Sequence, residues 1–219
     1  NAKKLLENAE ISSIKKALGL QSGHVYKNID ELRYGKVLVL SDQDEDGTHI
    51  KGLVFNLFHS LWPSLYNTPG FLNSMLTPVI KAKKGKQVVQ FYSVKDYDKW
   101  KESHLGFSIK YYKGLGTSTP QEAREYFKEF KNVKYLTNDE ENNNAIELAF
   151  SKNEDSANNR KVMLSEYDRN KTLDYSKKNV SIKEFVYEDL IHFFESDNIR
   201  SIPSAIDGLK PSQRKVLYC

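Results

Sequence analysis

The spacing of apolar residues changes twice in the first third of the chain, and each change predicts an element. Residues 37–40 form a short continuous apolar run, which is typical of a strand buried on both faces of a parallel sheet. Residues 50–61 carry apolar side chains at helical spacing, and Pro63 should end that helix. Open α/β sheets bind ligands at the carboxyl ends of their strands, so the polar turn between the two segments is a candidate site.

That turn carries three carboxylates, Asp42, Asp44 and Asp46, and is followed by Gly47. Carboxylates this close raise one another's pKa, and a cation or a proton relieves the repulsion. Hard oxygen ligands suit Mg²⁺ or Mn²⁺, so the turn is a candidate metal site. The plain alternative is an acidic surface turn in which Asp and Gly serve only the backbone conformation.

Residues 42–47 also match the opening of an EF-hand loop. The twelfth position of such a loop should be a bidentate Glu, but here it is Leu53. The loop should also follow a helix, whereas the apolar run before it is typical of a strand. We therefore reject an EF-hand.

An aspartate-nucleophile phosphatase is another alternative, because residues 44–48 match its D-x-D-G-T motif literally. Such an enzyme needs its nucleophile directly after the strand, but Asp42 intervenes. It also needs a second acidic pair after a later apolar strand, whereas the later acids at 139–141 lie in an Asn-rich run. This alternative, with Asp44 as the nucleophile, stays open.

Elsewhere the chain alternates between helical and extended patterns, which predicts an α/β protein. Strands are expected at 71–80, at 87–92 after a Lys-Gly hairpin turn, and at 107–111. Helices are expected at 3–19 with Gly19 as their end, around residues 97–100, after the capping box of Thr119 and Glu122, after the capping box of Ser181 and Glu184, and from Lys210 onward, where Tyr218 should lie in the core. Residues 132–159 are expected to be a polar connector, broken only by a helix at 145–150.

The composition narrows the class of protein only slightly. With 28% charged residues and a formal net charge of +4, the 219-residue chain is globular in composition, and its mild basic excess does not establish a nucleic-acid partner. Its one cysteine, Cys219, excludes an internal disulfide and fits a reducing compartment. No apolar run of about eighteen residues and no signal peptide is visible, so we expect neither a membrane span nor secretion. The chain begins without Met and stops inside an apolar-periodic helix, so we expect a fragment.

A set of segments spread over nearly the whole chain adds a much more specific signal. The central one is Ser-Asp-Gln-Asp-Glu-Asp-Gly-Thr-His-Ile-Lys-Gly at 41–52, and the others are 7–11, 33–36, 76–80, 110–118, 148–152 and 198–218. In this order they resemble the TOPRIM domain and the DNA gate of type IIA DNA topoisomerases, most of all the eukaryotic-type form. The acidic motif alone is weak, but the ordered set is highly specific.

The resemblance implies a fold and a division into domains. It implies a TOPRIM Rossmann-like parallel sheet with flanking helices, followed by a helical connector and the first helices of a winged-helix domain. The expected TOPRIM domain covers 1–133 without its N-terminal strand, the connector 134–180, and the truncated winged-helix DNA-gate domain 181–219.

The resemblance also implies an activity. The parent enzyme would be an ATP-dependent type II DNA topoisomerase, which relaxes and decatenates DNA by passing one duplex through a double-strand break in another. Asp42 and Asp44 would hold Mg²⁺, with Mn²⁺ or Ca²⁺ able to substitute, and Asp46 would be a supporting ligand or hydrogen-bond partner. The nucleophilic tyrosine would lie downstream, Tyr34 would be structural, and ATP would bind outside this segment, so the segment would be inactive alone.

Finally, the resemblance implies the partners and their contacts. The partner would be double-stranded DNA, and the expected contact residues are Lys113, Arg160, Lys161, Arg200, Lys210, Arg214 and Lys215. The plain alternative for such cations is a solvated surface, and a non-catalytic DNA-binding module is a third functional alternative. The parent would be a homodimer, located in the nucleus of a eukaryote, in an organelle or in a viral cytoplasmic factory.

Overall fold

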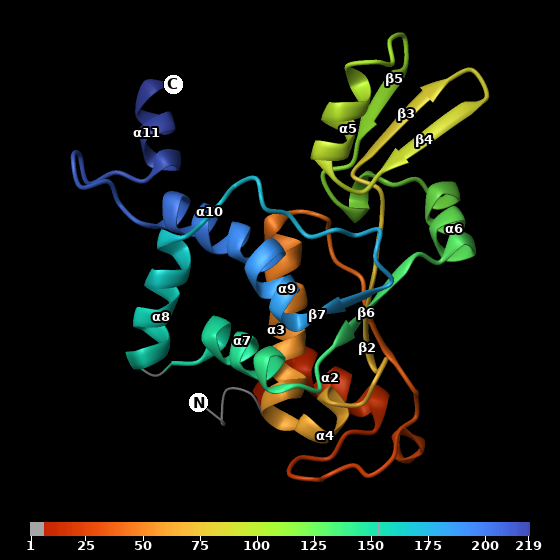
Figure 1. Cartoon of the computed structure of the whole chain (residues 1–219), viewed down its shortest axis with the longest axis vertical. Helices are drawn as coiled ribbons and strands as arrows, with labels where there is room; N and C mark the ends of the chain where they lie inside the picture. Colours follow the sequence, from red (N-terminus) through yellow and green to blue (C-terminus); the bar gives the residue numbers. More distant parts are fainter. Residues whose placement is uncertain (1–6, 153) are drawn as a thin grey trace.

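The computed structural model describes residues 7–152 and 154–219, and its main body is built around a four-stranded sheet (Figure 1). In spatial order the strands are β1 (Val37–Val39), β2 (Leu72–Met75), β6 (Asn132–Leu136) and β7 (Asn179–Ser181). The pair β1 and β2 and the pair β6 and β7 are parallel, and an antiparallel pairing of β2 with β6 joins them. The expected α/β class is therefore confirmed, with one antiparallel pair inside the sheet.

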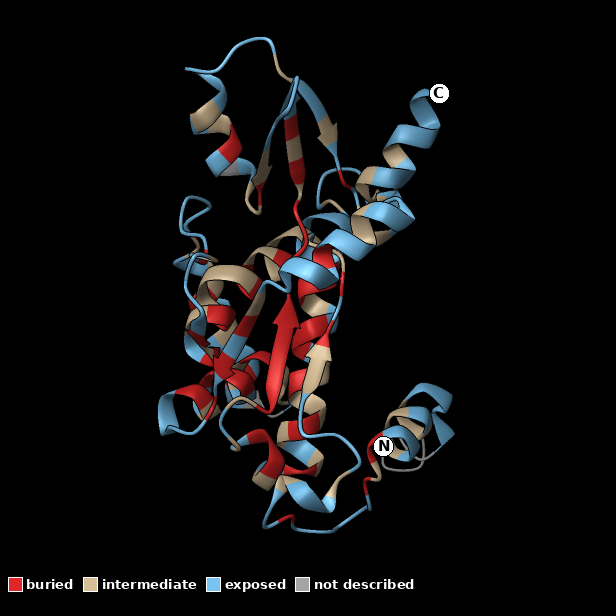
Figure 2. Ribbon diagram, turned by 90° about the vertical axis from the view of Figure 1, so that its right-hand side faces the viewer, coloured by how far each residue is buried: buried red, intermediate tan, exposed pale blue. Residues whose placement is uncertain are grey.

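The helix expected after the acidic turn is α3 (Glu45–Leu61), which begins earlier than expected, inside that turn, and lies at the centre of the core. The buried ring of Phe55 lies 4.5 Å from that of Tyr135 on β6 and 5.4 Å from that of Phe185, measured between centroids. Buried residues gather on the strands of the main sheet and on the helices around it (Figure 2). Burial of one such ring contributes roughly 1.5–3 kcal/mol, so α3 holds the acidic turn firmly at the end of β1.

Further helices surround this core, and several begin or end where the sequence predicts. They are α2 (Ala9–Leu18), η1 (Ile29–Glu31), α4 (Pro63–Tyr66), α7 (Glu140–Phe150), α8 (Glu154–Ser165), α9 (Ile182–Phe185), the π-helical turn η3 (Val186–Leu190), α10 (Ile191–Ser201) and α11 (Pro211–Tyr218). Gly19 ends α2 in the left-handed region with φ 80°. Ser181 and Glu184 form the predicted capping box of α9, and Lys210 directly precedes α11.

A second, smaller sheet projects from one end of the body and has its own core (Figure 1). Its antiparallel strands are, in spatial order, β4 (Gln87–Phe91), β3 (Ile80–Lys84) and β5 (Ser108–Tyr111), and α5 (Val94–Lys101) packs against them. Gly85 has φ 59° in the hairpin turn, a conformation that glycine adopts without strain. The chain then returns through η2 (Leu115–Thr117) and α6 (Pro120–Glu129), which begins at the predicted Thr119 capping box.

Two expectations about the main sheet and the helices around it are wrong. Residues 132–159 are not a mostly irregular connector, because they form β6, α7 and the first half of α8. The strand signal of β6 was hidden because only Val133 and Tyr135 face inward, while its other residues are polar or exposed. Strand β1 is likewise not buried on both faces: it lies at the edge of the sheet, and only Val39 is buried.

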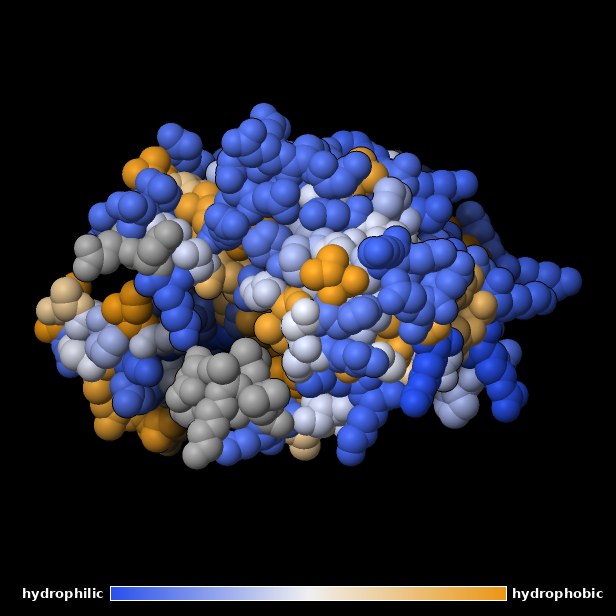
Figure 3. All heavy atoms as spheres, turned by 90° about the horizontal axis from the view of Figure 1, so that it is seen from below, coloured by the Kyte–Doolittle hydropathy of each residue, from blue (hydrophilic) through white to orange (hydrophobic). Residues whose placement is uncertain are grey.

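One face of the described molecule is largely polar. The face seen from below is mostly hydrophilic, with scattered hydrophobic residues (Figure 3). No helix in the described part of the chain is long and apolar enough to cross a membrane. Tyr218 was expected in the core, but it is 87% exposed on α11, so its apolar neighbours do not place it against the body.

The proposed division into three domains stays a prediction. The boundary after residue 133 falls inside β6, and the boundary after residue 180 falls inside β7. Both strands pair within the main sheet, so the predicted connector and the start of the third part share a core with the first part.

Candidate metal and nucleic-acid site

The acidic turn joins the end of β1 to the start of α3 in a very tight conformation. Asp44 is the N-cap of α3, and its Oδ1 accepts a hydrogen bond from the Gly47 N–H at 2.7 Å. A Cβ at Gly47 would lie only 2.0 Å from the carbonyl oxygen of Asp42, so only glycine fits at this close approach. The cap and the close approach together fix Asp42 and Asp44 relative to the helix.

Asp42 meets a second glycine-containing turn, which comes from a distant part of the sequence. The Leu115 N–H donates to Asp42 Oδ1 at 2.6 Å. A Cβ at Gly114 would lie 2.5 Å from Asp42 Oδ2, so the turn can approach this closely only because Gly114 has no side chain. The Gly-containing turn at 113–118 therefore contacts the acidic turn.

The third acid, Asp46, contacts a different residue, Arg200. Its Oδ2 accepts from Arg200 Nη1 at 2.9 Å, and its Oδ1 accepts from Arg200 Nη2 at 2.5 Å. These hydrogen bonds from Arg200 lower the pKa of Asp46. Arg200 also donates through Nε to Asp197 at 3.2 Å. Both oxygens of Asp46 thus accept hydrogen bonds from Arg200, and its role beside a metal ion stays a prediction.

The donor set at the turn fits a hard divalent cation through two of the three acids. Among the described residues no group of three or more His, Cys, Asp or Glu side chains could hold a metal ion, so a site made of Asp42, Asp44 and Asp46 together stays a prediction. Asp42 and Asp44 each use Oδ1 for an N–H, and no described residue donates to either Oδ2. Mg²⁺ is commonly held by one or two carboxylates together with water and substrate phosphates. Asp42 and Asp44 fit that pattern.

The three arginines expected to contact DNA are all engaged within the protein. Arg160 Nη1 donates to the carbonyls of Leu148 and Ser151 at 2.9 and 3.0 Å, which satisfies the C-terminal end of α7. Arg214 forms a bidentate pair with Asp207 at 2.9 and 2.7 Å. Together with the pair between Arg200 and Asp46, these contacts give each arginine a structural role that the sequence did not reveal.

The four lysines of the expected DNA surface are differently placed. Lys113, Lys161 and Lys215 are exposed, and Lys210 is half-buried just before α11. No carboxylate forms an ion pair with any of them in the described part of the chain. Because they carry unpaired positive charge at the surface, the lysines are better placed than the arginines to meet phosphate.

A buried charge on α3 was not predicted from the sequence. Lys51 on α3 is 1% exposed, and its Nζ lies 3.7 Å from Asp189 Oδ2 on η3. The hydroxyl groups of Thr48, at 3.4 Å, and Tyr175 also donate to Asp189. Burial lowers the pKa of Lys51, but Asp189 and Tyr135 outweigh burial and raise it. Its position in the sequence could have predicted this burial, because helical spacing places Lys51 on the same inward face of α3 as Thr48 and Phe55.

This combination of an edge strand, an acidic turn and a helix, next to a second glycine-containing turn, defines a TOPRIM-type site. The chain belongs to the family described as the C-terminal associated domain of TOPRIM, whose model matches residues 75–198. Membership of this family implies a divalent metal requirement in general terms.

The proteins that this chain resembles narrow the family further. DNA topoisomerase 2 of Arabidopsis thaliana is 48% identical over 222 residues, covering 98% of this chain and 15% of that protein. DNA topoisomerase 2 of Saccharomyces cerevisiae is 45% identical over 226 residues, covering 100% of this chain and 16% of that protein. The crystal structure of the Plasmodium falciparum topoisomerase II DNA-binding, cleavage and re-ligation domain matches with a TM-score of 0.88 and 40% identity, covering 100% of this chain and 30% of that one. The resemblance to type IIA topoisomerases is confirmed, and the chain spans about 15% of the length of its full-length relatives.

Proposed function

We propose that this chain is part of the DNA cleavage and religation core of an ATP-dependent type II DNA topoisomerase, which relaxes and decatenates DNA by double-strand passage. The observation that carries the proposal is the contact between Asp42 and the turn at 113–118, where Leu115 donates to the carboxylate and Gly114 allows the close approach. Two segments of the family pattern, far apart in the sequence, thereby form one site. The likeness to the named topoisomerases supports the same function.

In this proposal Asp42 and Asp44 hold Mg²⁺, and Mn²⁺ or Ca²⁺ can take its place in binding. The bound metal supplies charge stabilisation to the scissile phosphate and to the leaving oxygen. The Leu115 N–H and the Gly47 N–H orient the two carboxylates, and Asp46 holds Arg200 beside them. Lys113, Lys161, Lys210 and Lys215 contact DNA phosphates, while Arg160, Arg200 and Arg214 order the surface that carries them.

The partners and the location belong to the same proposal. The substrate is double-stranded DNA, the parent protein is a homodimer, and ATP binds outside this segment. A nuclear or organellar location is supported by the eukaryotic relatives, one of which, from Dictyostelium discoideum, is named mitochondrial.

Removal of the metal tests this function most directly. Full-length protein carrying this segment should convert supercoiled DNA into covalent protein-bound linear product with Mg²⁺, and should stop doing so with a chelator. Excess Mg²⁺ or Mn²⁺ should restore the product after chelation, because hard oxygen ligands accept either ion. Cleavage that persists without divalent metal would contradict the proposal. A phosphoryl group found covalently on Asp44 would favour the phosphatase alternative instead.

The lysines give a separate test of DNA contact. Lys210→Ala should lower the slope of log affinity against log salt concentration by about one unit, because one phosphate contact and its released counterion are lost. Lys16→Ala is the matched control, since Lys16 is an exposed lysine on α2 and should leave the slope unchanged. Fluorescence anisotropy with a short duplex at several salt concentrations measures both. An unchanged slope for Lys210→Ala would remove this residue from the DNA surface.

A further inference from the structure

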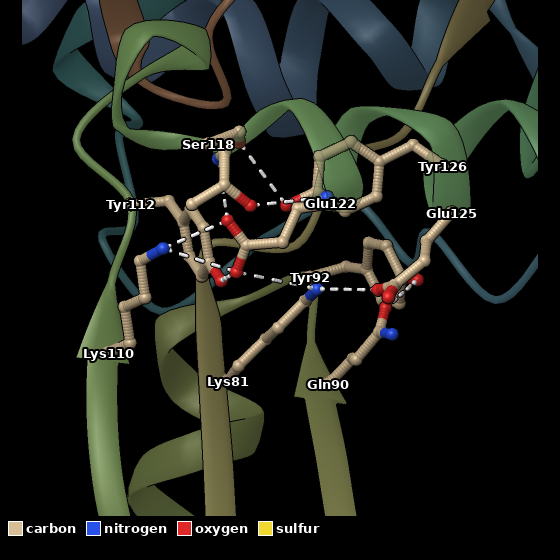
Figure 4. A network of polar contacts seen from close by, with 10 residues as sticks. Lys81, Gln90, Tyr92, Lys110, Tyr112, Ser118, Glu122, Glu125 and Tyr126 are labelled. Carbon is tan, nitrogen blue, oxygen red and sulfur yellow. Dashed lines mark hydrogen bonds and ion pairs between the residues drawn. The ribbon is translucent and has the colours of Figure 1, made fainter.

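A polar network centred on Glu122 lies at the base of the turn that contacts Asp42 (Figure 4). Lys110 Nζ donates to both carboxylate oxygens of Glu122, at 3.1 and 2.9 Å, and the Tyr112 hydroxyl also donates to Oε1. The Thr119 N–H donates to Oε2 at 2.7 Å. The Glu122 side chain is only 16% exposed, so these partners largely replace water.

These partners stand on both sides of the turn at 113–118. Lys110 and Tyr112 precede the turn at the end of β5, whereas Thr119 and Glu122 follow it at the start of α6. Glu122 therefore ties the two ends of the turn together. Because closing the base of a loop removes conformational freedom from its tip, the position of Leu115 depends on this carboxylate.

Lys81 on β3 extends the network to the small sheet. Its Nζ lies 3.8 Å from Glu122 Oε1 and 3.5 Å from Glu125 Oε2, and it lies 4.9 Å from the ring centroid of Tyr126. Glu122 is thus held by cations from two strands of that sheet, Lys81 and Lys110. Glu122 thus joins α6 to the small sheet, and Lys81 adds contacts to Glu125 and Tyr126 on the same helix.

Electrostatics favour the charged form of Glu122. Burial raises its pKa, but the hydrogen bonds from Thr119, Tyr112 and Lys110 outweigh burial and lower the pKa to about 2. The carboxylate is therefore ionised at neutral pH, and it can accept from all of its donors at once. A neutral amide in its place would lose the charge and would present an N–H₂ group toward at least one donor.

We propose that Glu122 is a positioning residue for Asp42: it closes the base of the turn at 113–118 and so holds the Leu115 N–H against the Asp42 carboxylate. The inference rests on the proposed metal-binding role of Asp42. Glu122 itself would touch neither the metal nor the substrate, and it would act only through the turn that orients Asp42. Groups that orient a metal ligand in this way commonly change metal affinity by about 10–100-fold when they are removed.

The first measurement is the amide proton shift of Leu115 by NMR in the 219-residue chain. Glu122→Gln should move this resonance upfield, because its hydrogen bond to Asp42 lengthens when the turn loosens. Glu125→Gln is the matched control: Glu125 is the neighbouring acid on α6, and its side chain is 46% exposed. An unchanged Leu115 resonance in folded Glu122→Gln would overturn the positioning role, whatever the function of the site.

The second measurement is Mn²⁺ affinity by electron paramagnetic resonance in the same variants. Glu122→Gln should weaken binding by about tenfold, and Glu125→Gln should not. Asp42→Asn separates the two hypotheses, because Mn²⁺ binding that does not depend on Asp42 would refute the proposed metal site itself. Equal Mn²⁺ affinity in wild type and Glu122→Gln, with binding still dependent on Asp42, would refute only the role of Glu122.

A second pair of variants covers the case in which Glu122→Gln does not fold. Gly114→Ala places a methyl group within 2.5 Å of Asp42 Oδ2 and leaves the Glu122 network intact, whereas Gly116→Ala adds a methyl group with nothing within 4 Å. Gly114→Ala should shift the Leu115 resonance and weaken Mn²⁺ binding, and Gly116→Ala should do neither. If Gly114→Ala leaves both unchanged, the turn does not orient Asp42 and the inference fails.

Discussion

Asp42→Asn should lower Mg²⁺-dependent DNA cleavage by the full-length protein by at least about a hundredfold, the scale on which loss of one group that stabilises transition-state charge is felt. Asparagine has nearly the same shape, and its Oδ1 can still accept the Leu115 N–H that Asp42 Oδ1 accepts at 2.6 Å. The turn should therefore stay folded while the negative charge is lost. Quantifying covalent DNA cleavage on a gel across a Mg²⁺ titration measures the effect, and DNA binding should persist.

Asp139→Asn is the matched control for this variant. Asp139 caps α7 by accepting the Asn142 N–H at 2.7 Å, much as Asp44 caps α3, and asparagine caps a helix equally well. This control should cleave DNA at the wild-type level. If Asp42→Asn also cleaves normally, the acidic turn is scaffold and the proposed function loses its site.

Lys51→Met should be the most destabilising single change considered for this chain, at about 3–5 kcal/mol, the typical cost of removing one partner from a buried ion pair. The methionine fills the space of the lysine stem, but Asp189, whose side chain is only 17% exposed, then keeps its charge with only the hydroxyl groups of Thr48 and Tyr175 as donors. Urea denaturation followed by circular dichroism measures the free energy of unfolding.

Two further variants make this result specific. Lys183→Met removes a surface ion pair with Glu141 in which both side chains are at least half exposed, so its effect should be far smaller. The double variant Lys51→Met with Asp189→Leu should recover part of the loss, because no unpaired charge remains. A Lys51→Met protein as stable as Lys183→Met would show that Lys51 contributes no more than a surface lysine.

The ion pair between Lys51 and Asp189 also helps to hold the acidic turn in place. Lys51 and Asp46 both lie on α3, while Asp189 lies on η3 and Arg200 on α10, which continues from η3. The two ion pairs therefore join the same two helical segments, one in the core and one at the surface beside the acidic turn. Loss of Lys51 should loosen this junction and reduce cleavage as well as stability.

The sequence by itself determined the local elements. The Thr119 and Ser181 capping boxes and the end of α2 at Gly19 were predicted correctly. The helix α3 was also predicted, but it begins at Glu45, inside the acidic turn and not after it. These features depend on contacts between residues three or four positions apart, which a pattern of residue types records directly. The acidic turn could be located as a site for the same reason.

Only the tertiary structure decided which side chains meet across long stretches of sequence. The contacts of Asp42 with Leu115, Asp46 with Arg200, and Lys51 with Asp189 each join residues more than 70 positions apart. Spacing along the chain carries no record of such contacts, because they depend on how the strands are ordered and how the helices pack. For this reason the sequence identified the three acids together, and only the fold shows that Asp46 accepts from Arg200 while Asp42 accepts from Leu115.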